Sequence, residues 1–238
     1  MKILAIDTSG QSAGLAILED DNPLYEININ MEIHHSEILL PALDDMCRAT
    51  GIAVKDMDLF ACTTGPGSFT GLRIGLSTVK GMAMATGKPV VGVSTLEALA
   101  CNAMQSSLTV CPVMDARKNQ IYAAMFKTDP SCVPDRFGPD ALAEVDTFLG
   151  SIKGRALFLG DGAVRYAKEI LAFLGDQCCF GESIQHRIRG AAVGFLGYRK
   201  YRAGEVDDAL TIMPRYLRLS EAEEKKRLAG MHNEPDRH

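Results

Sequence analysis

The feature that constrains this chain most is an order of elements that occurs twice. Residues 3–18 are two short apolar runs around a small polar turn, which predicts a β-hairpin, and residues 108–127 have the same arrangement. An aspartate lies in each turn region, Asp7 in the first and Asp115 in the second. Strands and helices then alternate after each hairpin, which is typical of an α/β layer fold. We therefore expect two α/β lobes with a cleft between them.

The first half should contain two long helices. One covers 36–49, where Leu39, Leu43 and Met46 recur at spacings of four and three. Proline is tolerated without cost only in the first turn of a helix, so this helix begins near Leu39 or bends at Pro41. The other elements expected in this half are strands at 24–31, 58–64 and 88–93 and helices at 69–86 and 94–104.

The second half should contain shorter elements and end in a charged tail. A helix that follows Ser220 would be nearly all charged, so it would have little to bury. The elements expected here are a loop at 128–139, helices at 146–152, 164–174 and 191–202, and a strand at 156–159. We divide the chain into a first lobe at 1–104, a second lobe at 105–219 and a C-terminal tail at 220–238.

The first hairpin turn has the groups of a phosphate-binding loop. Asp7 can hold a hydrated magnesium ion, while the hydroxyls and backbone N–H groups of Thr8 and Ser9 can approach phosphate oxygens. The same residues also fit an ordinary turn, in which Asp and Ser bond their own backbone. Residues 65–68, Gly-Pro-Gly-Ser, join a strand to a helix but lack the Gly-Lys-Ser/Thr of a Walker A loop. Both turns therefore stay open between an anion site and a structural turn.

Candidates for catalysis or metal binding are scarce. The five histidines form no HExxH or HxxxH pattern, and the seven cysteines form no CxxC pair. The one GxSxG match, at residues 10–14, lies in the turn of the predicted first hairpin rather than at a strand-to-helix elbow, so it does not predict a nucleophilic serine. We therefore expect no metal and no catalytic residue.

Charge and hydropathy narrow the class of protein further. The net charge is −5, and residues 1–100 hold 6 basic and 12 acidic side chains. Nucleic-acid binding needs clustered Lys and Arg, so this half should not bind RNA by itself. No apolar run approaches the roughly 20 residues of a membrane helix, and the short apolar start ends in an acid rather than in a signal-peptide pattern. We expect a cytoplasmic protein without a membrane segment.

Several motifs together resemble one family. The most specific is residues 64–75, Thr-Gly-Pro-Gly-Ser-Phe-Thr-Gly-Leu-Arg-Ile-Gly; others are residues 3–10, 35–41, 89–97 and, more loosely, 115–117, 160–163 and 214–218. These stretches resemble the TsaB family. The resemblance implies a two-lobed actin/hexokinase-like (ASKHA) fold, each lobe a mixed sheet with flanking helices. It also implies a role in making N6-threonylcarbamoyladenosine beside the anticodon of tRNAs.

The resemblance implies an accessory subunit rather than an enzyme. The catalytic paralogue, TsaD, binds a metal through a His-x-x-x-His helix motif, and Thr95 and Leu99 occupy the two corresponding positions here. A hydroxyl and a leucine cannot replace two imidazoles on a transition metal. The implied partners are a TsaD-like subunit that this chain activates, a TsaE-like ATPase, tRNA only through the complex, and a second copy of the chain in a homodimer. No cofactor is expected on the chain itself, although ATP can lie at the junction of the complex.

The resemblance also places the partner interface on the two long helices of the first lobe. Two small residues, Gly71 and Gly75, leave a flat helix face that serves either internal packing or a close partner. The apolar residues of both helices exceed what we expect one sheet face to cover. The expected interface is His35, Leu39, Leu43, Met46, Gly71, Leu72, Arg73, Gly75, Leu76, Val79 and Lys80, with Asp7, Thr8 and Ser9 as a vestigial phosphate loop.

Two other functions are compatible with this fold. An ATP-dependent small-molecule kinase would use Asp7, but Asp115-Ala116-Arg117 places an arginine where bare backbone should meet phosphate. A TsaD-like peptidase would need the histidine pair that the chain lacks.

Overall fold

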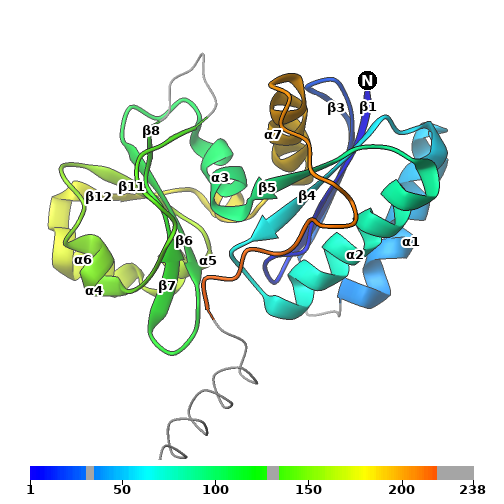
Figure 1. Ribbon diagram of the computed structural model, residues 1–238. Coiled ribbons are helices and arrows are strands. Elements are labelled where there is room, and N and C mark those ends of the chain that lie inside the picture. The colour runs from blue at the N-terminus through cyan, green and yellow to red at the C-terminus, as the bar shows by residue number, and fades with distance from the viewer. Residues whose placement is uncertain (31–34, 128–133, 219–238) are drawn as a thin grey trace, which may run out of the picture.

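A computed structural model describes residues 1–30, 35–127 and 134–218 of the chain. These residues form two lobes, each built on one mixed sheet (Figure 1). The predicted tail at 220–238 and part of the predicted loop at 128–139 lie outside the described residues. No helix within the described ranges combines the length and the hydropathy that a membrane crossing requires.

The first lobe is a five-stranded sheet in the order β3-β2-β1-β4-β5. The predicted hairpin is confirmed: β1 and β2 are antiparallel, and their last pair joins Asp7 to Gly14. β4 and β5 then add in parallel on the other side of β1. The strands are β1 (Lys2–Asp7), β2 (Ala13–Glu19), β3 (Asn22–Ile29), β4 (Leu59–Gly65) and β5 (Val90–Ser94).

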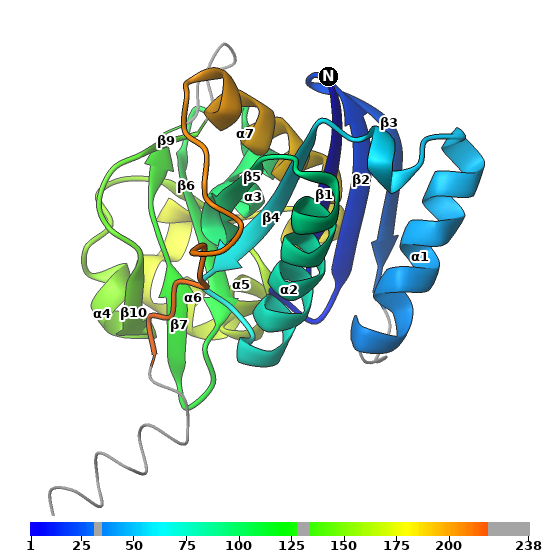
Figure 2. The ribbon, with the colours of Figure 1, turned by 45° about the vertical axis from the view of Figure 1, so that its right-hand side comes forward.

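Helices cover both faces of this sheet. Successive side chains of a strand point to opposite faces, so Leu4 and Ile6 of β1 pack toward α1 and α2, while Ile3 and Ala5 pack toward α7. Figure 2 shows α1 and α2 side by side on the first of these faces. The helices are α1 (His35–Thr50), α2 (Phe69–Thr86), α3 (Thr95–Ala100) and α7 (Gly190–Arg202), with 3-10 turns η1 (Val54–Asp56) and η2 (Cys101–Ala103).

The ends of the two long helices can be compared with the limits predicted from the sequence. α2 begins at Phe69 and ends before Gly87, whose φ of +67° is the left-handed conformation typical of a helix C-terminus, so that prediction is confirmed. α1 begins at His35, so a start near Leu39 is wrong. Pro41 lies inside α1 on an exposed face. The carbonyl group that loses its helical partner there therefore faces water.

The second lobe is a seven-stranded sheet with shorter helices. Its main order is β10-β7-β6-β11-β12, and the predicted second hairpin is confirmed by the antiparallel pair β6–β7. The predicted helix at 164–174 is two helices that meet at Tyr166. The elements are β6 (Thr109–Asp115), β7 (Gln120–Ala123), β8 (Phe126–Lys127), β9 (Asp135–Arg136), β10 (Ala141–Glu144), α4 (Val145–Leu149), β11 (Ala156–Leu159), α5 (Asp161–Arg165), α6 (Ala167–Leu174), η3 (Gly175–Gln177), β12 (Cys178–Phe180) and η4 (Ser183–His186).

The range 105–219 does not coincide with one lobe. α7 returns to the first sheet and packs across β1, β2 and β4. Three glycines allow α7 to approach the sheet closely. A Cβ added at Gly190 would lie 2.4 Å from the carbonyl carbon of Leu15. One added at Gly194 would lie 2.1 Å from Leu18 Cδ1, and one at Gly197 would lie 2.5 Å from Ala61 Cβ.

The segment after α7, residues 205–218, also runs along the first lobe, and we call it the strap. Asp207 donates its backbone N–H to the carbonyl oxygen of Val90 at 2.9 Å, beside β5. The strap then passes along α2 toward the second lobe, as both ribbon views show.

Candidate partner-binding surface and the buried Asp7 loop

Asp7 ends β1 and is completely buried. Its Oδ1 atom accepts three hydrogen bonds, from the Ser9 backbone N–H at 3.0 Å, the Ser9 hydroxyl at 2.6 Å and the Thr63 hydroxyl at 2.7 Å. Burial raises the pKa of Asp7, and these hydrogen bonds oppose that shift. Thr8 and Ser9 are buried as well. The predicted phosphate loop is therefore a buried turn whose hydroxyls are already bonded within the chain.

The start of α2 covers this turn. Ser68 donates its backbone N–H to the carbonyl oxygen of Ser9 at 2.7 Å, and the Thr8 hydroxyl donates to the carbonyl oxygen of Gly71 at 2.7 Å. An added Cβ would lie 2.0 Å from the Thr8 carbonyl oxygen at Gly71 and 2.3 Å from the Thr8 hydroxyl oxygen at Gly75. The two glycines thus serve internal packing, and their placement in a partner interface is corrected.

Most of the other expected interface residues are buried too. They pack against the sheet within the chain itself, so the assumption that the sheet could not cover them is wrong. Alternating side chains of β1, β2 and β4 supply the opposing apolar surface. The buried residues are Leu39, Leu43, Met46, Leu72, Leu76 and Val79, in addition to the two glycines.

The three remaining expected residues contact other parts of the chain. His35 donates from Nε2 to the carbonyl oxygen of Gly10 at 2.9 Å. Lys80 donates to the carbonyl oxygens of Leu210 and Ile212 in the strap, at 3.1 and 3.2 Å. Arg73 is exposed, and its Nε donates to the hydroxyl of Tyr216, also in the strap, at 3.0 Å. Periodicity within the helices gave no sign of the strap, because a contact about 130 residues away leaves no local pattern.

What remains accessible between α1 and α2 is a groove of about 500 Å³. Leu40 on its α1 side is 59% exposed, so it presents an apolar surface to the groove. The groove combines this apolar wall with hydroxyl groups and one cation. Its lining includes Ser36, Leu40, Phe69, Arg73, Ile74 and Ser77. The sequence analysis did not include Leu40 because it lies at the border of the apolar stripe formed by Leu39, Leu43 and Met46.

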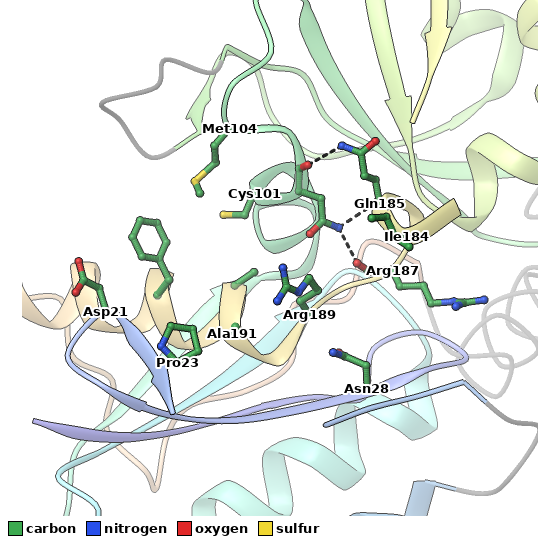
Figure 3. A pocket seen from close by; sticks show the side chains of 13 residues that line it. Asp21, Pro23, Asn28, Cys101, Met104, Ile184, Gln185, Arg187, Arg189 and Ala191 are labelled. Atoms are coloured by element: carbon green, nitrogen blue, oxygen red, sulfur yellow. Dashed lines mark hydrogen bonds between the residues drawn. The ribbon is translucent and has the colours of Figure 1, made fainter. Parts of the chain in front are cut away.

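A second cavity, of about 680 Å³, lies where η2, η4 and α7 meet the β2–β3 turn (Figure 3). The Asn102 side chain spans two elements there, donating to the carbonyl oxygens of Gln185 at 3.0 Å and Arg187 at 2.7 Å. The Gln185 amide donates back to the carbonyl oxygen of Asn102 at 2.9 Å. These bonds hold η4 against η2 and shape one wall of the cavity.

The space between the first hairpin turn and the start of α5 is small. Gly10, Gly160 and Asp161 line a space of about 60 Å³, whereas sites for small molecules are typically 300–1,000 Å³. Burial raises the pKa of Asp161, whose Oδ1 accepts the backbone N–H of Asp115 at 3.2 Å. Asp115 itself forms an ion pair with Arg165 at 3.1 Å. Within the ranges that the structure covers, no three His, Cys, Asp or Glu side chains are placed to hold a metal ion.

Comparisons with known proteins agree with this architecture. The family model described as TsaD, tRNA N6-adenosine threonylcarbamoyltransferase, matches residues 30–176. The TsaB protein of Bacillus subtilis, a tRNA threonylcarbamoyladenosine biosynthesis protein, is 32% identical over 94% of this chain and 97% of its own length. The structure of YeaZ from Pseudomonas aeruginosa superposes with a TM-score of 0.79 at 25% identity, covering 91% of this chain and 99% of that one.

A more distant structure supports the fold alone. Component A of the (R)-2-hydroxyglutaryl-CoA dehydratase from Acidaminococcus fermentans has a TM-score of 0.51 at 10% identity, covering 85% of this chain and 99% of its own. The two-lobed actin/hexokinase-like fold that the sequence predicted is therefore confirmed. Since the Bacillus subtilis relative matches nearly from end to end, the chain belongs to the TsaB family of tRNA threonylcarbamoyladenosine biosynthesis proteins.

Proposed function

We propose that this chain is a non-catalytic subunit that binds and activates a TsaD-like transferase in the formation of threonylcarbamoyladenosine on tRNA. The observation that carries the proposal is the groove between α1 and α2, where Leu40 stays exposed beside Arg73. Interfaces concentrate their binding free energy in a few apolar and arginine side chains that a partner can desolvate. This groove is such a place, and it lies within residues 30–176, which match the transferase model.

The buried groups of the chain support an accessory role. Thr95 and Leu99, at the positions of the paralogue's two histidines, are core residues of α3. The Asp7 carboxylate, on which the alternative of a kinase depends, has its Oδ1 atom committed to three donors. The cleft of about 60 Å³ next to Asp161 is too small for a nucleotide in this conformation. These features also weigh against a TsaD-like peptidase.

The proposed assembly has four members. The groove would take the TsaD-like subunit, and a second copy of this chain would compete for the same surface in a homodimer. A TsaE-like ATPase would join the complex, ATP would lie at the subunit junction, and tRNA would be contacted only through the complex. We further propose that the assembly works in the cytoplasm, where tRNA is modified.

The test mixes the purified chain with the TsaD-like subunit of the same organism. The mass of the complex is measured, together with the transfer of labelled threonine to tRNA by the complete set of proteins. We expect a heterodimer and activity that depends on this chain. A chain that modifies tRNA alone, or a transferase that works equally well without it, would refute the proposal.

A matched pair of variants locates the surface. Leu40→Asp places a charge in the groove, and Leu171→Asp makes the same change on α6 in the other lobe, where the leucine is 57% exposed. Burying an unpaired charge at an interface costs several kcal/mol, so Leu40→Asp should abolish the complex while Leu171→Asp leaves it intact. Equal effects of the two variants would place the interface elsewhere.

A further inference from the structure

The strap is bonded to the first lobe from Asp207 to Tyr216. The Asp207 carboxylate accepts the backbone N–H of Gly92 at 2.8 Å, and Ile212 is buried in the core between the strap and the sheet. Further along, Arg215 donates its backbone N–H to the carbonyl oxygen of Thr64 at 2.6 Å. An added Cβ at Gly65 would lie 2.6 Å from the carbonyl oxygen of Arg215, so the strap passes tightly over the end of β4.

Beyond that point Tyr216 meets two residues of the groove. Its ring stacks on the ring of Phe69, with centroids 3.8 Å apart and planes 9° from parallel. Its hydroxyl accepts a hydrogen bond from Arg73, whose guanidinium carbon lies 4.5 Å from the Phe69 centroid. Three flexible side chains thus hold one another in a single arrangement. Among the ion pairs found in the described residues none includes Arg73, so its charge stays available to an acidic group.

The end of the strap reaches the other lobe. The Arg218 guanidinium donates to the carbonyl oxygen of Ala116 and to the side-chain oxygen of Gln120, both at the turn of the second hairpin. Tyr216 is therefore held between an anchor on β4 and an anchor on the second lobe. Its position depends on both lobes, and so does the position of the two groove residues that it contacts.

We propose that Tyr216 is a positioning residue of the partner surface: it fixes Phe69 and Arg73 in the groove before the partner arrives. This inference rests on the proposed function. Ordering an arginine side chain at an interface costs binding free energy, and a stack that orders it beforehand removes that cost. The free energy of an aromatic pair and the free-energy cost of ordering a side chain each correspond to a change in affinity of about 3- to 10-fold.

The experiment measures the dissociation constant for the TsaD-like subunit with three variants of the full chain. Tyr216→Ala removes the stack, Tyr216→Phe keeps the stack but loses the hydroxyl, and Met213→Ala truncates an exposed residue of the same strap as the control. We expect Tyr216→Ala to weaken binding about 3- to 10-fold, Tyr216→Phe to recover part of that loss, and Met213→Ala to bind as the unchanged chain does. Saturating concentrations of Tyr216→Ala should restore the full rate of tRNA modification.

A double-mutant cycle with Arg73→Ala separates positioning from mere stability. If Tyr216 acts through Arg73, the double variant of Tyr216→Ala and Arg73→Ala will lose less binding free energy than the sum of the two single losses. The double variant of Met213→Ala and Arg73→Ala will lose the sum of its single losses. Additive losses, or unchanged affinity of a folded Tyr216→Ala variant, would overturn the inference. If the unchanged chain does not bind the subunit, the proposed function fails. Amide hydrogen exchange of the free chain then still tests the positioning role. Tyr216→Ala must speed exchange at the start of α2 and not in α1.

Discussion

Three glycines of α2 allow a decision between internal packing and a partner face. An added Cβ at Gly71 would meet the Thr8 carbonyl oxygen at 2.0 Å, and one at Gly75 would meet the Thr8 hydroxyl oxygen at 2.3 Å. Gly81 lies on the same helix with no atom within 4 Å of its added Cβ. Alanine at Gly81 should therefore stabilise the isolated chain by about 1 kcal/mol, the ordinary gain of alanine over glycine in a helix.

The other two alanine variants should behave in the opposite way. Overpacking costs about 1–3 kcal/mol and occasionally more, so after the helix gain of about 1 kcal/mol Gly75→Ala should lose up to about 2 kcal/mol. Gly71→Ala should lose more, about 3 kcal/mol, because its clash is with a backbone carbonyl that cannot turn away. For a chain of this size each kcal/mol corresponds to about 2–4 °C in Tm.

Thr8→Ala supplies the internal control for these values. It removes the hydroxyl that Gly75→Ala would strike, so the double variant should be more stable than the sum of the two losses predicts. It leaves the carbonyl oxygen in place, so it should not rescue Gly71→Ala. The assay is urea unfolding of the isolated chain at two protein concentrations, which separates any contribution from self-association. Stabilisation by alanine at all three positions would show that the glycines face outward and would refute the reasoning.

Other predictions concern the buried carboxylates. Burial raises the pKa of Asp7 above its ordinary value of 3.8, so the contribution of Asp7 to stability should be largest below that pH and should be lost as the pH rises through the raised pKa of the folded chain. Chemical unfolding from pH 4 upward should therefore give a free energy of unfolding that falls with pH relative to that of Asp7→Asn. Thr63→Val removes one donor to Asp7 and should cost about 1–3 kcal/mol, measured by the same method at pH 7. The pKa of Glu26 is lowered because hydrogen bonds from Arg189 and Ala191 outweigh burial, so its contribution should be lost as the pH falls below 4.5, and Glu26→Gln should remove that acid sensitivity from thermal melts.

Local structure followed from the sequence because its signals are local. The helix at 69–86 was predicted as closing at Gly87, and the structure places α2 at Phe69–Thr86 with Gly87 at its C-terminal cap. The positions of α7 and of the strap were not predicted. α7 contacts strands that precede it by more than 100 residues, and only its glycines at 190, 194 and 197 indicated that it would pack closely against something.

The prediction of residues for the partner surface was limited for a different reason. Periodicity identifies the apolar side of a helix, but it does not say whether the chain or a partner covers that side. In α1 and α2 the apolar stripe was already used by the sheet, so a residue such as Leu43 or Leu76 has no surface left to offer. The accessible apolar group, Leu40, lies at the border of the stripe.

The same reasoning explains how a chain can keep this fold without keeping a phosphate loop. A loop that binds phosphate must leave backbone N–H groups and hydroxyls unpaired and pointing outward. Here the N–H and hydroxyl of Ser9 both bond to Asp7, and the Thr8 hydroxyl bonds to Gly71. The turn after β1 therefore supports α2 from below, and through α2 it supports the groove. The Thr8 hydroxyl and the Ser9 carbonyl oxygen bond to the start of α2, so a variant that frees the turn for phosphate should loosen that end of the helix.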